Sequence, residues 1–178
     1  ISALPDPLDA SLGLTIDGSD LFESLGGDVS ASGDFNGDGI VDLLLGADGL
    51  KAPNGNFIGG AYVVFGPADT ASTDVSSLNG GNGFTFIGRD TLDNFGTGRT
   101  VGSAGDINND GIDDLIIGAP LNSFGNVTLN EGEAYVVFGS QSGFPATLRP
   151  EDLNGANGFI LEGKTEGDLL GDAVAPAG

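Results

Sequence analysis

The sequence predicts an all-β fold made of four-stranded antiparallel β-propeller blades, two of them complete and flanked by further strands, as in a partial propeller. Three observations predict it. Short motifs return in the same order about every 70 residues, the distance from Asp34 to Asp106 being 72. Apolar residues come in short runs separated by Gly, Asn and Asp, as hairpins require. No segment combines helical periodicity with caps at both ends.

The repeats are read directly from the sequence. Three segments align without gaps: GLTIDGSDLFESLG (13–26), GFTFIGRDTLDNFG (83–96) and GFILEGKTEGDLLG (158–171). Between them, GGAYVVFG (59–66) matches GEAYVVFG (132–139). A β-sandwich of unrelated strands would not explain why these motifs recur in one order, so we expect repeated blades.

Each period supplies four strand candidates, in chain order. The first alternates small residues and suits a crowded inner strand, the second and third are continuous apolar or β-branched runs, and the fourth is half apolar and suits an outer strand. These candidates are DVSAS and TVGSAG, LLLGA and LIIGA, AYVVFG in both copies, and FTFIG and FILEG. The segment TDVSSLNG (73–80) has room for one helical turn at most.

Charge and composition exclude several functions. The 178 residues include 26 acidic and 5 basic ones, a net charge of −21, which excludes nucleic-acid binding and favours cations or cationic surfaces as partners. The absence of Cys and His removes disulfides, ordinary zinc sites, Cys nucleophiles and His-based triads. No run approaches the ~18 apolar residues of a membrane helix, so we expect no membrane insertion. Because the chain begins at Ile1 without Met, we expect a mature or excised piece of a longer protein.

Two acidic loops are the candidate functional sites. GDFNGDGIVDLLLGA (33–47) and GDINNDGIDDLIIGA (105–119) share the pattern D-x-N-x-D-G-x-x-D. In a tight loop the side chains of alternate residues converge, the glycine takes the sharp bend, and the following residue offers its carbonyl. Such an all-oxygen shell suits Ca²⁺ better than Mg²⁺, so we predict about two Ca²⁺ per chain. The predicted ligands are Asp34, Asn36, Asp38, the Ile40 carbonyl and Asp42, and Asp106, Asn108, Asp110, the Ile112 carbonyl and Asp114.

Two other interpretations of these loops, an EF-hand loop and a solvated hairpin turn, fit the sequence less well. An EF-hand loop carries Glu at its twelfth position and lies between helices, whereas that position is Leu45 or Ile117 here. The loops could also be solvated hairpin turns, although that does not explain why every acidic and amide position recurs. Empty, each loop would hold repelling carboxylates, so a bound ion should stabilise the fold, by about 2.7 kcal/mol at a free concentration 100 times Kd.

These motifs resemble the FG-GAP repeat of integrin α-subunit propellers and their bacterial relatives over residues 12–178. The residues that carry the resemblance are Phe95-Gly96 and Gly118-Ala119-Pro120 around the second loop, with Leu25-Gly26 and Gly46-Ala47-Asp48 in the first copy. The resemblance implies that each calcium loop joins the first and second strands of a blade, and that seven blades close a ring. The predicted boundaries are 1–20 for a lead and the outer strand of a preceding blade, 21–88 for the first blade with loop 34–42, 94–163 for the second with loop 106–114, and 164–178 for the first strand of a third.

The function predicted from these features is a calcium-binding, non-enzymatic adhesion or scaffold module, secreted or at the cell surface. Its ligand would be a protein or glycan contacted by residues 46–60 and 119–133, and further blades or copies of the chain would complete the ring. The alternative is a propeller fragment of a carbohydrate-active enzyme or lectin. Sugar sites favour aromatic platforms, whereas the only large polar aromatics, Tyr62 and Tyr135, are expected to pack in the core or at an edge.

Overall fold

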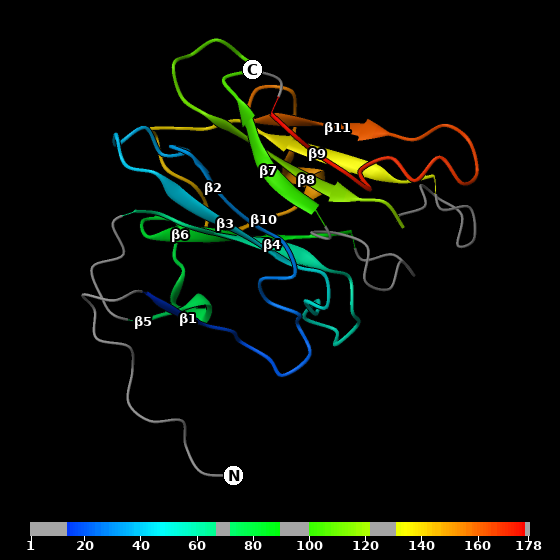
Figure 1. Cartoon of the computed structure of the whole chain (residues 1–178), viewed down its shortest axis with the longest axis horizontal. Coiled ribbons are helices and arrows are strands. Elements are labelled where there is room, and N and C mark those ends of the chain that lie inside the picture. The colour runs from blue at the N-terminus through cyan, green and yellow to red at the C-terminus, as the bar shows by residue number, and fades with distance from the viewer. Residues whose placement is uncertain (1–13, 67–71, 90–99, 122–130, 177–178) are drawn as a thin grey trace.

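The computed structural model describes residues 14–66, 72–89, 100–121 and 131–176, and this part of the chain is all-β apart from two short 3₁₀ helices. Figure 1 shows three successive layers: a small pair of strands near the N-terminus, a central sheet and a second large sheet. The two large sheets are the predicted blades, which we call blade 1 and blade 2.

Blade 1 consists of four antiparallel strands in chain order: β2 (Val29–Gly33), β3 (Asp42–Ala47), β4 (Gly60–Val64) and β6 (Gly83–Ile87). Its rows of paired residues cross the sheet in register, so Leu44 lies opposite Val63 and Val63 opposite Phe84. Because side chains alternate between the faces of a sheet, these three project from one face.

Blade 2 repeats this arrangement with β7 (Thr100–Gly105), β8 (Asp114–Ala119), β9 (Glu133–Val137) and β11 (Gly158–Glu162). In both blades the first strand has a register irregularity just before the acidic loop, between Ser30 and Gly33 and between Ser103 and Gly105. The all-β propeller-blade fold predicted from the sequence is therefore confirmed.

Two short strands, Ser72–Asp74 and Thr147–Leu148, were not foreseen, whereas a third, Thr15–Asp17, lies within residues 1–20, where the outer strand of a preceding blade was expected. β1 (Thr15–Asp17) pairs in parallel with β5 (Ser72–Asp74), and β10 (Thr147–Leu148) pairs in parallel with β6 of blade 1. A 3₁₀ helix follows each of β5 and β10, namely η1 (Val75–Ser77) and η2 (Pro150–Asp152). η1 is the single turn for which the sequence left room. Strands of two or three residues have no periodicity to detect, which is why sequence analysis found no sign of β5 and β10.

The core lies between the two blades. One face of blade 1 packs on blade 2 through a buried cluster that includes Phe84, Phe86, Leu115 and Tyr135. Phe144, from the connection between β9 and β10, stacks on Phe84 with ring centroids 4.5 Å apart. The opposite face of blade 1 forms a second cluster that covers Tyr62 and packs against β1. The blades are thus joined by alternating apolar residues, as the strand pattern requires.

The C-terminal segment differs from expectation. Residues 164–176, expected to contain the first strand of a third blade, form no strand in the structure. Their main link to blade 2 is an isolated parallel bridge between Leu170 and Gly132. The physical reason is that an inner strand needs a neighbour to complete its ladder, and this segment has none beyond that bridge.

Candidate metal centres

Each acidic loop connects the first and second strands of its blade, loop 1 between β2 and β3 and loop 2 between β7 and β8. Strands rather than helices flank both loops, which sets them apart from EF-hands. Gly39 and Gly111 have φ of +88° and +89°, and a Cβ atom at either would meet nothing within 4 Å. These glycines are therefore required by backbone conformation and not by lack of space.

The side chains of loop 1 fold inward onto its own backbone. The N–H of Asp38 donates to both Asp34 Oδ1 and Asn36 Oδ1, each at 3.0 Å. The N–H of Gly39 donates to Asp34 Oδ2 at 2.8 Å, and Asn36 Nδ2 donates to Asp38 Oδ2 at 2.9 Å. Two predicted ligand oxygens, Asp34 Oδ1 and Asn36 Oδ1, thus accept from one N–H, and the Asp38 carboxylate accepts from the side-chain amide of Asn36.

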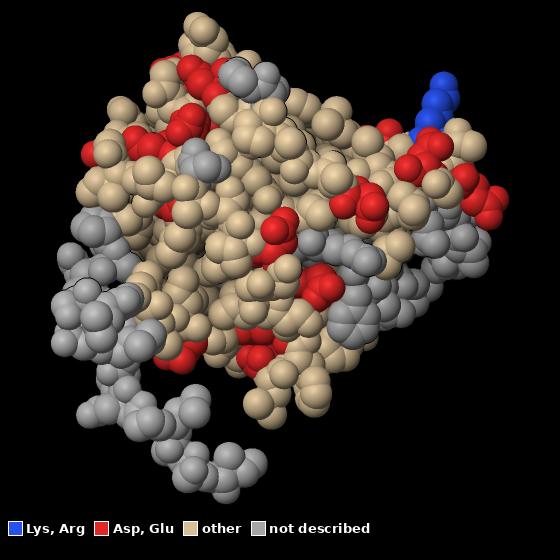
Figure 2. Space-filling model, viewed as in Figure 1, with Lys and Arg blue, Asp and Glu red and all other residues tan. Residues whose placement is uncertain are grey.

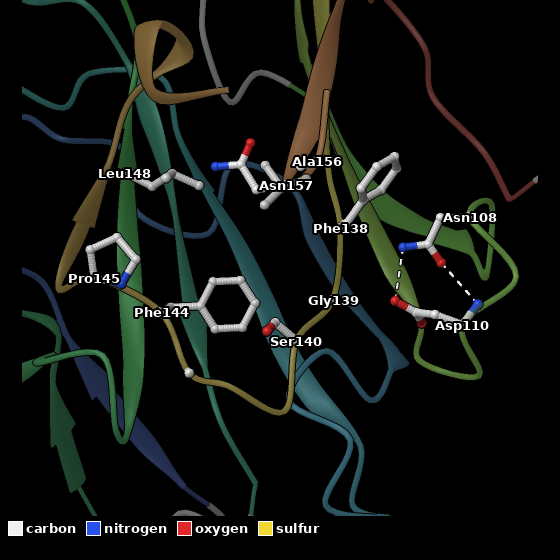
Figure 3. Close-up of a pocket in the computed structure, with 12 residues that line it drawn as sticks. Asn108, Asp110, Phe138, Gly139, Ser140, Phe144, Pro145, Leu148, Ala156 and Asn157 are labelled. Atoms are coloured by element: carbon white, nitrogen blue, oxygen red, sulfur yellow. Dashed lines mark hydrogen bonds between the residues drawn. The ribbon is translucent and has the colours of Figure 1, made fainter. Parts of the chain in front are cut away.

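Loop 2 repeats these contacts one for one. Asp106, Asn108 and Asp110 accept from the N–H groups of Asp110, Gly111 and Ile112 at 2.8–3.0 Å, and Asn108 Nδ2 donates to Asp110 Oδ2 at 2.8 Å. Figure 3 shows both hydrogen bonds between Asn108 and Asp110. Two unrelated turns would have no reason to share these contacts.

The ninth residue of each loop is a buried anchor. Asp42 accepts from the N–H of Phe35 within its loop at 2.8 Å and from the N–H of Gly66 after β4 at 2.9 Å. Asp114 does the same with Ile107 and Gly139 at 2.8 and 2.9 Å, and both carboxylates are fully buried. They therefore pin the loop to the end of the third strand of the same blade.

The environment of these anchors is electrically unfavourable without a cation. Burial raises the pKa of Asp42 above its ordinary value of 3.8, and the negative charges of Asp38 and Asp34 add to the effect against the two N–H donors. Burial likewise raises the pKa of Asp114, and the charge of Asp110 contributes. A divalent cation nearby would attract these carboxylates and so favour their charged form.

The donor set fits a hard cation after a local adjustment. In the described residues no three acidic side chains are already arranged as a metal shell. Asn36 and Asn108 must supply amide oxygens, the carbonyls of Ile40 and Ile112 complete the expected set, and the carboxylates must turn from their backbone donors. All of these groups are oxygens, which suit Ca²⁺.

Contacts between the two loops were missed by sequence analysis. Asp113, the eighth residue of loop 2, accepts from the N–H of Asp34 at 3.0 Å instead of facing its own loop. From the connection after β9, the N–H of Ser140 donates to Phe35 O at 2.9 Å and Gln141 Nε2 to Gly37 O at 3.2 Å. Blade 2 therefore holds loop 1 in place. The only sequence signal was that Asp113 has no acidic counterpart in loop 1, where Val41 occupies the position.

Comparison with known proteins identifies the repeat. Residues 97–137, which span β7, β8 and β9 with loop 2, match the family model of the FG-GAP repeat. The chain carries FG-GAP repeats. It is 38% identical over 120 residues to phosphatidylinositol-glycan-specific phospholipase D of Rattus norvegicus, covering 65% of this chain and 13% of that one. It is 34% identical over 164 residues to the enzyme of the same name from Homo sapiens, covering 83% and 18%.

An integrin is also similar. Integrin alpha-6 of Gallus gallus is 29% identical over 164 residues, with 89% of this chain and 14% of the integrin covered. The chain thus spans less than a fifth of the length of these three relatives. The FG-GAP repeat itself is a non-catalytic repeat, and the similarity to the phospholipases covers a small part of their chains. Phe95-Gly96, the first half of the FG-GAP signature in blade 2, lies outside the described residues.

A pocket of about 280 Å³ lies beside loop 2 of the FG-GAP blade. Figure 3 shows Asn108 and Asp110 on one side of it, and Phe144 and Leu148 on the other. Its floor is the end of β9 and the residues that follow, including Phe138. The side chains of Asn108 and Asp110 are therefore accessible from a partly apolar hollow lined by loop 2 and residues 137–157.

The two tyrosines are buried in the core, so neither is an exposed aromatic platform. Each hydroxyl donates to a buried glutamate, Tyr62 to Glu23 at 2.9 Å and Tyr135 to Glu133. Arg89 lies 3.6 Å from Glu133, from its Nε to Oε2. These buried polar groups are structural partners within the FG-GAP blades.

Among the described residues no helix is long and apolar enough to cross a membrane. Figure 2 shows acidic side chains spread over the face in view, while blue, the colour of Lys and Arg, appears only at its upper right edge. Of the candidate ligand loops, residues 46–60 are described and lie beside exposed Leu21 and Phe22. Most of the other loop, residues 122–130, lies outside the described residues.

Proposed function

We propose that this chain is a calcium-binding, non-enzymatic adhesion or scaffold module, secreted or at the cell surface, in which two Ca²⁺ ions stabilise the FG-GAP blades. The observation that carries the proposal is the identity of the two loops: five side-chain contacts of loop 1 recur in loop 2 between matching atoms. Conserving that arrangement within one chain is expected of a binding site and not of a solvated turn.

The ion would act on the fold through position and charge. Asp34 and Asp38 lie at the exposed end of loop 1, and Asp42 at its buried end contacts the backbone after β4. A cation bound among them would neutralise their repulsion and tie β2 to the end of β4. This favours calcium-rich surroundings outside the cell.

The experiment is a calorimetric titration with CaCl₂ of the ion-free chain and of its Asp38→Ala and Asp110→Ala variants. We expect about two sites in the parent, one in each variant and none in the double variant, with a parallel MgCl₂ titration giving weaker binding. Glu166→Gln is the control, since Glu166 is exposed and outside both loops. Unchanged stoichiometry in the double variant would refute the sites.

The adhesion role rests on a separate surface. Leu21 is 93% exposed and Phe22 65%, and Lys51 lies over the rings of Phe22 and Phe57 in the candidate ligand loop. Lys51 is half-buried and paired with Asp20 at 2.6 Å, so the exposed apolar groups Leu21 and Phe22 are what mark a place for a protein or glycan ligand. Immobilised parent chain and a Phe22→Ser variant, compared for retention on integrin-binding matrix proteins and glycans, test this role.

The second candidate is a propeller portion of a carbohydrate-active enzyme or lectin. Its support is that two of the relatives are named phosphatidylinositol-glycan-specific phospholipase D. A glycan array tests this second candidate, and an array without binding would count against it.

A further inference from the structure

We propose that the pair Asn36-Gly37 in loop 1 is a site of spontaneous covalent modification, at which the backbone nitrogen of Gly37 attacks the side-chain amide of Asn36. The product carries aspartate or isoaspartate in place of Asn36. The assignment of the site is independent of calcium, and only its consequence for the ion rests on the proposed function.

The reaction needs only the chain and water. The Gly37 nitrogen forms a bond to Cγ of Asn36, the bond from Cγ to Nδ2 breaks, and the proton of the N–H leaves with that amide group as ammonia. Water then opens the cyclic imide, which gives either aspartate or isoaspartate, whose backbone runs through the side chain. Glycine after asparagine favours the first step because it has no Cβ to hinder ring closure.

The sequence contains six Asn-Gly pairs, and the structure selects among them. Three pairs are blocked at the attacking nitrogen, because the N–H groups of Gly55, Gly80 and Gly155 each donate to a backbone carbonyl at 2.8–2.9 Å. That hydrogen bond fixes the turn and has to break before the nitrogen can approach the preceding side chain.

Two further pairs, Asn82-Gly83 and Asn157-Gly158, are blocked by packing. Both glycines are buried at the start of an outer strand, and a Cβ at either would lie 2.1 or 2.3 Å from a carbonyl oxygen of the neighbouring strand. Each asparagine side chain is also held by two hydrogen bonds of 2.9–3.3 Å to backbone groups three and five residues earlier. The ring therefore has no room to close.

Neither block applies to Asn36-Gly37. Within the part of the chain that the structure describes, the N–H of Gly37 forms no hydrogen bond, and both residues are partly exposed. The Asn36 side chain contacts exposed Asp38, accepting from its N–H at 3.0 Å and donating to its Oδ2 at 2.9 Å. Water can replace these exposed contacts, so the amide can turn toward the attacking nitrogen.

Loop 2 is a control inside the same chain. Asn108 makes the same two hydrogen bonds with Asp110, as Figure 3 shows, but the next residue is Asn109. Asn109 has φ of +60° where Gly37 has +71°, so the backbone conformation is matched and the Cβ of Asn109 is the difference. We therefore expect the modification in loop 1 and not in loop 2.

The modification would change loop 1 in a definite way. Either product replaces the Asn36 amide by a carboxylate, so repulsion takes the place of the hydrogen bond to Asp38. Isoaspartate also lengthens the backbone between Asp34 and Asp38 and so separates the Asp38 N–H from Asp34 Oδ1. With Ca²⁺ bound as proposed above, the chain would pass irreversibly from a two-site to a one-site form.

The test is peptide mass mapping of the full chain after incubation in EGTA, in mildly alkaline buffer made with heavy-oxygen water, which labels each opened ring. In urea all six pairs should react at similar rates. In the folded chain we expect Asn36 to react at least about 10-fold faster than Asn108 and than the asparagines of the other five pairs.

Two variants move the site. Asn109→Gly should give Asn108 the reactivity of Asn36. Gly37→Asn should lower the reactivity of Asn36 to that of Asn108, once the exposed Gln141 side chain over Gly37 turns aside. The proposal is overturned if another pair reacts first in the folded chain, if Asn36 and Asn108 react equally in the parent, or if Asn109→Gly leaves Asn108 unreactive.

Calorimetric titration of the incubated chain with CaCl₂ separates the modification from the proposed function. Loss of one of two sites in proportion to the isoaspartate content supports both, and two intact sites in a fully modified chain would overturn the consequence for the ion. A chain modified at Asn36 whose parent binds no Ca²⁺ would refute the proposed function and support the modification site. Unmodified Asn36 in a chain that binds two Ca²⁺ would do the reverse.

Discussion

Replacing the ninth residue of loop 1 by alanine should destabilise the fold with or without calcium, whereas replacing the fifth should destabilise it only when calcium is present. Asp42 is fully buried and accepts from the N–H groups of Phe35 and Gly66. Asp38 is exposed, and water can replace its contacts with the loop. Asp42 therefore has a structural role in any ionic condition, whereas Asp38 is expected to matter through the ion.

The magnitudes follow from these contacts. Asp42→Ala leaves the buried N–H of Phe35 and the partly buried N–H of Gly66 without an acceptor, at up to about 1–3 kcal/mol each, so the free energy of unfolding should fall by about 2–6 kcal/mol even in chelator. Asp38→Ala should change it by less than about 0.5 kcal/mol in chelator. In Ca²⁺ at 100 times Kd it should lose the linkage term of about 2.7 kcal/mol.

The assay is thermal unfolding followed by circular dichroism, in EGTA and in CaCl₂, for the parent and both variants. For a chain of this size 1 kcal/mol corresponds to about 2–4 °C in Tm, so Asp42→Ala should lower Tm on the order of 10 °C in EGTA. Asp114→Ala provides the matched replicate in loop 2. An Asp42→Ala variant that melts with the parent in EGTA would refute the anchoring role, and an Asp38→Ala variant equally destabilised in both buffers would refute the ionic one.

Three further predictions concern pH, packing and backbone conformation. Because the pKa of Asp42 is raised, the ion-free folded chain holds a proton that the unfolded chain releases, so this group's contribution to stability should fall as pH rises from 3.8 through the raised value. In urea titrations at different pH, Asp42→Asn should lack that dependence. In CaCl₂ the apparent affinity for Ca²⁺ should instead weaken as pH falls. Phe144→Ala removes a ring stacked on Phe84 between the blades and should cost about 2–4 kcal/mol in urea unfolding, whereas Phe144→Leu should recover at least half. Gly39→Ala should cost about 1–2 kcal/mol from its positive φ alone, but Gly83→Ala should cost more because its Cβ would lie 2.1 Å from Val63 O; equal losses would contradict this reasoning.

Much of the fold and of the candidate sites was readable in the sequence. Strand positions followed from runs such as LLLGA and AYVVFG, because a strand buried on both faces needs continuous apolar residues. The repeat period gave the order of strands in a blade, and the pattern D-x-N-x-D-G-x-x-D gave the residues of both loops. These features depend on neighbours in the chain, so local chemistry determines them.

Only the tertiary structure decided how one repeat contacts the next. Asp113 looks like any loop aspartate in the sequence, but it accepts from the first residue of the other loop. Asp42 reads as one more ligand, and packing makes it a buried anchor for a strand 24 residues away. The short strands β5 and β10 show no pattern in the sequence and exist because a neighbouring edge offers unpaired N–H and C=O groups. Contacts between distant segments depend on which surfaces meet, and the periodicity of a single segment carries no record of its partner.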